Sequence, residues 1–454
     1  MKKTLLLFLI LCMSFSLFSC ANVTDIPKDD GDEINFHGEK LNLYTHSWSL
    51  AVFTDTVPAN TDASRERRAK HIKKFEDDYN IVVNISESST AKIIGDMMNG
   101  TRTADLIYMY PYYLYDIYSA GALLPYDSIP DIDYSGGKFG PEKLLDQTLF
   151  GGKYYGIFTY MWESPPSLQG VLWINDGLIS EINGMTNPRE LIESDKWNWE
   201  TFREVCKQGT YSDEGEKHFA FGIANHGDSP ASDMLALECI YSNGGNPIFR
   251  ENGIYRSGLK DPKVTEALEY AASLKNDDII LYGVSGLSYT AWIYGQHPLY
   301  LAESYYVAKE DSPNALTDYG LISFPKGPSA NENSVGCFYY NTDHFTSVCA
   351  GTIFSEDEIA VIINRLFDRY ENSPYPEGWQ SYSIENSFIH ENDFYTYLNA
   401  LENAEYYNTT VFTSIAEEIT EAFDSIIVNG VSPETAVDSI SDAFTQSINE
   451  YYNQ

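Results

Sequence analysis

"TADLIYMYPYYLYDIYSAGALLPYD", residues 103–127, contains the segment on which the fold prediction depends. Its apolar run "ADLIYMY" (104–110) is predicted to be a strand. Two strands are predicted before it, "LNLYTHSW" (41–48) and "YNIVVNIS" (79–86), with an amphipathic helix over 63–79 between them. This βαβαβ order predicts an α/β fold with a mostly parallel sheet and helices on its faces.

Aromatic residues stand where these predicted strands end. Ligands of open parallel sheets bind beyond the carboxyl ends of the strands. Trp48, Tyr108 and Tyr110 fall at those ends, so they are candidates for a binding site.

Later segments carry clear helix-capping patterns. Asp261 before Pro262 predicts a helix start, and Ser355 with Glu358 forms a predicted capping box. Apolar stripes continue through the C-terminal third, with a predicted break at Gly430, so this third is expected to be largely helical.

The first 19 residues are typical of an export signal. Lys2 and Lys3 precede about 14 mostly apolar residues, "LLLFLILCMSFSLF" (5–18), whereas a membrane-spanning helix needs about 20. The segment could be a simple secretory signal with a chance cysteine at position 20. However, "LFSC" (17–20) resembles a bacterial lipobox, which implies cleavage before Cys20 and a lipid on its sulfur.

The residues after this cysteine are unsuited to a core. Residues 20–40 are rich in charged and turn-forming residues, and we interpret them as a flexible, lipid-anchored tether. The formal net charge of −37 makes nucleic acid an unfavourable partner and suits solubility outside the cell. The rest of the chain is long enough for two domains.

Four cysteines remain after Cys12 is removed with the signal and Cys20 is lipidated. Cys206, Cys239, Cys337 and Cys349 are too dispersed for a zinc pattern. Cys337 and Cys349 are close enough in sequence to pair, but unpaired buried thiols are an equal alternative.

Several segments, in the same order, resemble the family 1 extracellular solute-binding proteins. They are residues 103–127, "GGKYYGIFTY" (151–160), "QGVLWINDGLISE" (169–181), "LIESDKWNWETFREVCK" (191–207) and "YGLISFPKGP" (319–328). The resemblance covers most of residues 41–454 and implies a lipid-anchored substrate-binding subunit of an ABC importer, similar to the sugar-binding group. It also implies an extracytoplasmic monomer whose partners are a carbohydrate and the permease subunits of the importer.

The family fold implied by this resemblance is a type II two-lobe fold that closes on ligand. Carried over to this chain, it predicts crossings between lobes near 157–162, 297–304 and 337–343. The expected first lobe is 41–156 with 304–336, and the expected second lobe is 163–296 with 344–454.

The expected interlobe cleft is lined by residues near the crossings and at the sheet ends. The candidates are Trp48, Tyr108, Tyr110, Trp162, Glu163, Trp292, Glu303, Tyr305 and Tyr339. Carboxylates beside aromatic faces suit sugar hydroxyls. Each candidate has a simpler interpretation: Tyr108, Tyr339 and Trp292 could fill the core, and both glutamates could be solvated.

Two other classes of protein remain open. A glycoside hydrolase would also be acidic and aromatic, but recognisable catalytic motifs are absent from the sequence. A binding protein for a peptide or polyamine would suit the negative charge. The eight histidines have no metal-ligand spacing, so neither a metal site nor a cofactor is expected.

Overall fold

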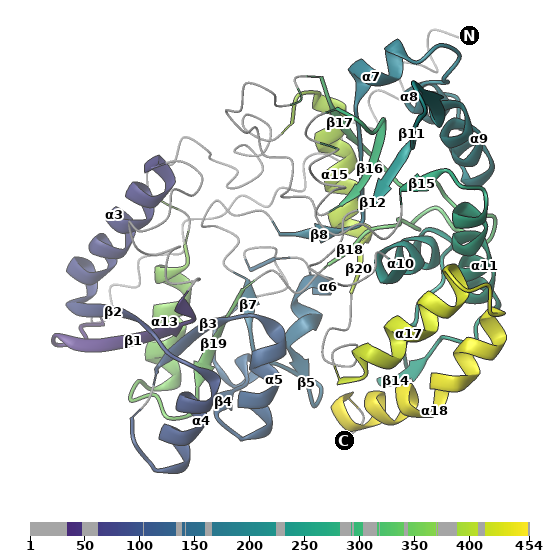
Figure 1. Ribbon diagram of the computed structural model, residues 1–454. Helices are drawn as coiled ribbons and strands as arrows, with labels where there is room; N and C mark the ends of the chain where they lie inside the picture. Colours follow the sequence, from purple (N-terminus) through teal and green to yellow (C-terminus); the bar gives the residue numbers. More distant parts are fainter. Residues whose placement is uncertain are drawn as a thin grey trace, which may run out of the picture.

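The computed structural model arranges the chain around two sheets, each flanked by helices (Figure 1). It describes residues 34–452, except 48–61, 103, 133–138, 141, 159–165, 224–231, 282–291, 293–294, 303–315, 317, 340–343, 369, 371–387 and 407–413. We call the group of elements around each sheet a lobe. This architecture agrees with the predicted α/β fold.

The first sheet has the strand order β2-β1-β3-β19-β4, and β7 also pairs with β19. β1, β2 and β3 are parallel, as the sequence predicted, whereas β19 is antiparallel to β3, β4 and β7. The strands are β1 Glu39–Thr45, β2 Ile81–Glu87, β3 Leu106–Met109, β4 Leu123–Leu124, β7 Ile157–Phe158 and β19 Phe345–Cys349.

Helices cover both faces of the first sheet. α3 (Asp62–Tyr79) and α13 (Glu356–Leu366) pack together, and the ring of His71 donates a hydrogen bond to the Leu366 carbonyl oxygen (3.0 Å). α4 (Thr90–Met98) and α5 (Pro111–Ser119) also contact each other. Shorter elements follow: η1 Tyr126–Ser128, α6 Glu142–Leu145, η2 Asp146–Thr148, β5 Leu149–Phe150 and β6 Lys153–Tyr154.

The second sheet has the order β15-β12-β16-β9-β17. β12, β15 and β16 are parallel, and β9 runs antiparallel to both β16 and β17. The strands are β9 Val171–Ile174, β12 Phe221–Ile223, β15 Ile280–Leu281, β16 Leu299–Ala302 and β17 Gly320–Ile322. β9, β12, β16 and β17 are buried along their whole length, as expected for strands covered on both faces.

Helices and two hairpins surround the second sheet, and the C-terminal pair α17–α18 is yellow in Figure 1. The helices are α7 Asp176–Glu181, α8 Pro188–Glu193, α9 Trp199–Gly209, α10 Ser232–Ser242, α11 Pro262–Asn276, α15 Glu391–Asn403, α17 Ala416–Ile427 and α18 Pro433–Tyr452. The hairpins are β10 Tyr211–Asp213 with β11 Glu216–His218, and β13 Ile248–Glu251 with β14 Ile254–Ser257.

The predicted helix caps are confirmed. The Asp261 side chain accepts a hydrogen bond from the Lys263 amide, and Pro262 begins α11. Ser355 and Glu358 form the expected capping box of α13. These caps were predictable because their hydrogen bonds connect residues only two or three positions apart.

A small sheet links the two lobes, with the order β20-β18-β8. Its strands are β8 Leu168–Gln169, β18 Phe338–Tyr339 and β20 Glu405–Tyr406. β8 leads directly into β9 of the second sheet, and β18 precedes β19 of the first sheet. Two connections between the lobes therefore pass through this linker sheet, one at β8 and one at β18, whereas β20 follows α15 of the second lobe.

Strand pairing corrects the expected lobe boundaries. We expected 304–336 in the first lobe, but β17 pairs with β9 of the second sheet. We expected 344–454 in the second lobe, but β19 pairs with β3, and α13 packs on α3. β16 and β17 lie in one sheet, so the expected crossing near 297–304 is wrong. The chain instead crosses between α13, which packs on α3 of the first lobe, and α15, which contacts β17 of the second lobe.

Buried apolar residues form two clusters. One includes Leu41, Phe75 and Ile363 between the first sheet and the α3–α13 pair. The other begins with Ile93 and Leu114 in α4 and α5 and continues through the linker strands into the second lobe.

All four remaining cysteines are buried free thiols, namely Cys206, Cys239, Cys337 and Cys349. Burial raises the thiol pKa values of the first three well above their usual range. Cys337 and Cys349 therefore do not form a disulfide, and the alternative of unpaired buried thiols is confirmed. Within the described residues, no helix combines the length and low polarity that are needed to cross a bilayer.

Candidate ligand-binding site

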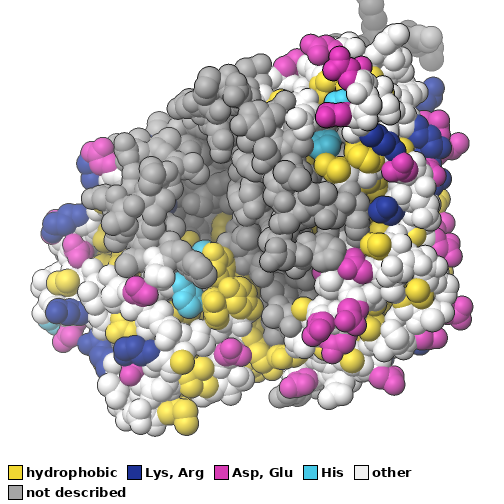
Figure 2. Space-filling view, in the orientation of Figure 1, with side chains coloured by type: hydrophobic (Ala, Val, Ile, Leu, Met, Phe, Trp, Pro, Cys, Tyr) yellow, Lys and Arg dark blue, Asp and Glu magenta, His cyan; other side chains and the backbone are white. Residues whose placement is uncertain are grey.

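Six aromatic and histidine side chains gather where β1 and β3 of the first sheet end. We call them the aromatic cluster: His46, Tyr108, Tyr110, Tyr112, Tyr113 and His344. In Figure 2, histidine side chains lie beside hydrophobic ones in the middle of the view, above the ends of β3 and β19.

The rings of the cluster are in direct contact. His344 stacks on Tyr108 with ring centroids 4.8 Å apart and an interplanar angle of 11°. It also lies 4.0 Å from the Tyr110 ring, which in turn stacks on Tyr112 at 5.6 Å and 8°. Tyr113 connects His46 to this group, with centroids 4.3 Å apart. Tyr108, Tyr110 and His344 are only half-buried, so parts of the cluster remain accessible.

Backbone geometry places these rings together. The Thr45 hydroxyl at the end of β1 donates a hydrogen bond to the Tyr108 carbonyl oxygen (2.8 Å). Tyr110 is the extended N-cap residue of α5, because Pro111 occupies the first helical position. His344 directly precedes β19, in which Thr346 lies opposite Tyr108.

Both histidines of the cluster are held in the neutral form. Burial lowers the pKa of His344 to about 3, and the nearby His46 lowers it further. Burial also lowers the pKa of His46, although Glu87 opposes this effect. A neutral imidazole has one hydrogen-bond donor and one acceptor. The cluster is therefore an uncharged surface of ring faces, phenols and imidazoles, which can stack on a flat ligand and exchange hydrogen bonds with hydroxyl groups.

The family of the chain follows from its sequence profile. The profile of the bacterial extracellular solute-binding proteins matches residues 61–346. The chain belongs to this family. No curated protein sequence matches the chain.

Solved structures share the type II fold of this solute-binding protein. The GacH receptor of Streptomyces glaucescens, solved unliganded and with acarbose, is 16% identical over 91% of this chain and 99% of its own, with a TM-score of 0.58. The cyclic alpha-maltosyl-1,6-maltose binding protein from Arthrobacter globiformis is 13% identical over 90% of this chain and 98% of its own, with a TM-score of 0.62. UgpB from Mycobacterium tuberculosis, in complex with glycerophosphocholine, is 14% identical over 90% of this chain and 98% of its own, with a TM-score of 0.57. At these identities, the likeness concerns the fold.

The predicted site residues fall into three groups in this solute-binding protein. Tyr108 and Tyr110 come together in the aromatic cluster. Trp292 is only 1% exposed and stacks on Tyr300 (5.4 Å, 12°), which is the core-packing alternative. Tyr339 is fully buried in β18, where its hydroxyl donates to the Leu401 carbonyl oxygen. Trp48, Trp162, Glu163, Glu303 and Tyr305 lie outside the described residues.

Sequence reasoning missed four members of the cluster. His46 directly follows β1, and Tyr112 and Tyr113 follow Tyr110, so the rule about strand ends could have included them. His344 has no such local signal. It reaches the cluster because β19 pairs with β3 from a position more than two hundred residues further along the chain.

Proposed function

We propose that the protein captures a carbohydrate between its two lobes and delivers it to the permease of an ABC importer. The observation that carries this proposal is the uncharged aromatic cluster at the strand ends of the first lobe. Sugar rings present flat apolar faces to aromatic rings and hydroxyl groups to neutral donors and acceptors. The acarbose and maltosyl-maltose ligands named for two of the structural neighbours agree with this class.

The proposed site extends beyond the described residues. We include Trp48, Trp162, Glu163, Glu303 and Tyr305, because in the sequence they follow the strands β1, β7 and β16 within a few residues. Trp162 and the two glutamates would supply a stacking face and charged acceptors that the aromatic cluster lacks. We leave out Trp292 and Tyr339, whose side chains are packed in the core.

We also propose that lipid on Cys20 anchors the protein at the outer face of the cell membrane. The support is the lipobox-like "LFSC" and the polar stretch 20–33, which would separate the folded lobes from the bilayer. The expected tether ends earlier than residue 40, because Phe36 is buried in the core of the first lobe and β1 begins at Glu39. The protein would act there as a monomer that binds its ligand without turnover, and the match to a family of solute-binding proteins supports the binding role.

A cationic solute is the second candidate ligand. Tyrosine faces attract ammonium groups, and the net charge of −37 would draw cations to the protein. UgpB, whose fold is similar, was solved with glycerophosphocholine, which carries a quaternary ammonium group. We prefer carbohydrate because the described part of the cluster contains phenols and neutral imidazoles rather than carboxylates.

A thermal-shift screen of the mature chain tests the proposed function. The panel should contain mono- and oligosaccharides, spermidine, glycerophosphocholine and a short peptide. A ligand that binds only the folded state raises stability by about 2.7 kcal/mol at a hundredfold excess over its Kd. We expect at least one saccharide to raise the Tm and to be recovered unchanged by chromatography. A response restricted to the cations would establish the second candidate, and cleavage of a saccharide would indicate a hydrolase.

A further inference from the structure

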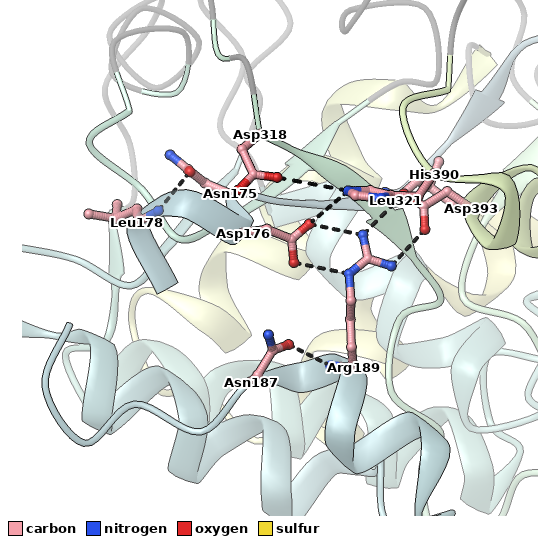
Figure 3. Close-up of polar contacts among 9 residues, drawn as sticks. All are labelled: Asn175, Asp176, Leu178, Asn187, Arg189, Asp318, Leu321, His390 and Asp393. Atoms are coloured by element: carbon pink, nitrogen blue, oxygen red, sulfur yellow. Dashed lines mark hydrogen bonds and ion pairs between the residues drawn. The ribbon is translucent and has the colours of Figure 1, made fainter. Parts of the chain in front are cut away.

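A polar cluster lies at the edge of the second lobe where β9 ends and β17 begins (Figure 3). Arg189 makes paired hydrogen bonds with Asp176 (3.0 and 2.9 Å) and with Asp393 (2.7 and 3.1 Å). These bonds raise the pKa of Arg189 although burial acts to lower it. A side chain at Gly320 would collide with the guanidinium, so this glycine leaves the space that Arg189 fills.

His390 turns its Nε2 atom toward two carboxylates of this cluster (Figure 3). The atom lies 3.7 Å from Asp176 Oδ2 and 3.9 Å from Asp318 Oδ1. Both separations are too long for hydrogen bonds. Nε2 is itself a buried atom without a hydrogen-bond partner, although the His390 side chain is 42% exposed. A buried nitrogen that faces two carboxylate oxygens without bonding to either therefore needs an explanation.

We propose that Asp176, Asp318 and His390 bind a divalent transition-metal ion, with Zn²⁺ as the favoured ion. One ligand atom from each residue lies within 4.8 Å of the other two. Zn²⁺ binds imidazole nitrogen and carboxylate oxygen at about 2.0–2.2 Å, so its ligand atoms lie roughly 3–4 Å apart. The two measured separations from Nε2 fall in this range. Asp318 is 59% exposed and free to close the remaining gap.

The charge of the cluster favours a cation. Arg189 carries one positive charge, whereas Asp176, Asp318 and Asp393 carry three negative charges. The four hydrogen bonds from the guanidinium go to Asp176 and Asp393, so they leave Asp318 uncompensated. A divalent ion would balance the remaining charge. The mixed nitrogen and oxygen donors favour Zn²⁺ over Ca²⁺, which prefers oxygen alone.

The ion would join three separate parts of the second lobe. Asp176 begins α7, Asp318 precedes β17, and His390 is the N-cap residue of α15. The α15 helix follows the chain segment that returns from the first lobe, so the ion would fix the point where this segment rejoins the second sheet. The site is thus structural and separate from the aromatic cluster. It departs from the sequence-based expectation of no metal, because its ligands are 142 and 72 residues apart and have no motif.

Protonated His390 is the competing explanation, because an imidazolium would pair with the same carboxylates. The two explanations have opposite pH dependence. A proton and a metal ion compete for Nε2, so metal binding weakens as the pH falls. An ion pair instead strengthens as the pH falls and needs no metal.

The test uses tag-free mature protein that has been treated with a chelator and then titrated with ZnCl₂ by calorimetry and thermal unfolding. We expect stoichiometric binding and a higher Tm for the wild type at pH 7.5. His390→Gln and Asp318→Asn should each weaken Zn²⁺ binding more than roughly tenfold and leave the metal-free Tm unchanged. The control is His218→Gln in the β10–β11 hairpin, where His218 stacks on Tyr211. Co²⁺ should give a visible absorption band in the wild type that both site variants lack.

Three results would overturn the proposal. One is equal Zn²⁺ binding by wild type and His390→Gln. Another is no binding by the wild type. The third is a stabilisation of the wild type at acidic pH, without metal, that His390→Gln abolishes while the Zn²⁺ response is unaffected. None of these results depends on the ligand of the aromatic cluster.

Discussion

The imidazole of His344 stacks on the ring of Tyr108, with centroids 4.8 Å apart and planes 11° from parallel. Tyr108 lies in β3 and His344 directly precedes β19, which pairs with β3 in the antiparallel direction, so backbone pairing brings the two rings together. Because burial keeps His344 neutral, it supports Tyr108 without adding charge to the cluster. The arrangement gives the first lobe a surface of packed aromatic rings, on which a flat ligand can stack.

The three linking segments predict that the lobes move relative to one another. Ligand held between them should favour the closed form through the extra contacts made there. Small-angle scattering of the mature protein should give a smaller radius of gyration with a saturating ligand than without it. The same radius in both states would indicate a rigid binder.

Replacement of Trp292 by alanine should reduce stability and leave ligand affinity unchanged. Its indole is 1% exposed and stacks on Tyr300, so truncation leaves a cavity that costs about 3–5 kcal/mol. Urea unfolding measures the loss, and calorimetry of the same variant measures affinity. A variant with unchanged stability and weakened ligand binding would show instead that Trp292 contacts the ligand.

The buried acid Asp233 should make stability depend on pH. Burial raises its pKa to about 6, a nearby Asp424 adds to this effect, and a hydrogen bond from Thr420 opposes it. As the pH rises from about 4, the unfolded chain loses this proton before the folded chain does, so wild-type stability falls until about pH 6. Asp233→Asn should remove this fall and be more stable at pH 7 by up to about 3 kcal/mol.

The control for this prediction is Asp357→Asn, which changes an exposed acid in α13. Unfolding curves of the three proteins at several pH values between 4 and 8 separate the effects. Glu238 lies on α10, as Asp233 does, and is fully buried, so burial raises its pKa well above its usual range. Glu238→Gln should therefore extend the gain in stability over the wild type to higher pH. Parallel wild-type and Asp233→Asn profiles would show that Asp233 titrates normally.

Cys20→Ser should abolish membrane attachment and leave folding intact. A serine hydroxyl cannot replace the cysteine sulfur in the proposed lipid linkage, and the stretch 21–33 that follows Cys20 contains few apolar side chains. Detergent partition and mass measurement of the expressed protein test this. A serine variant that stays full-length in the membrane fraction would contradict the proposed lipidation.

The sequence predicted features whose causes are local. The strands near 41–48, 79–86 and 104–110 and the caps at Asp261 and Ser355 are confirmed, because they depend on neighbouring residues. Tyr108 and Tyr110 were proposed by the same local reasoning, and the structure places both in the aromatic cluster.

The errors concern pairing between distant segments. Leu321 in β17 and Val348 in β19 would be buried in either sheet, so hydrophobicity alone could not assign them to a lobe. The same reason hid His344, which joins the cluster only through the pairing of β19 with β3. Trp292 illustrates a second difficulty, because an indole in an apolar segment is equally compatible with core packing and ligand stacking.

The central claim is that a carbohydrate binds at the aromatic cluster. The most direct test is calorimetric titration of a saccharide from the screen into wild type, Tyr110→Ala and Tyr395→Ala. Tyr395 is a matched control, because it is a 57% exposed tyrosine on α15 outside the cluster. Loss of one stacked ring should cost about 1–3 kcal/mol, so Tyr110→Ala should bind roughly 10- to 100-fold more weakly, with Tyr395→Ala unchanged. Equal affinity of all three proteins, or binding of spermidine with no heat from any saccharide, would contradict the account.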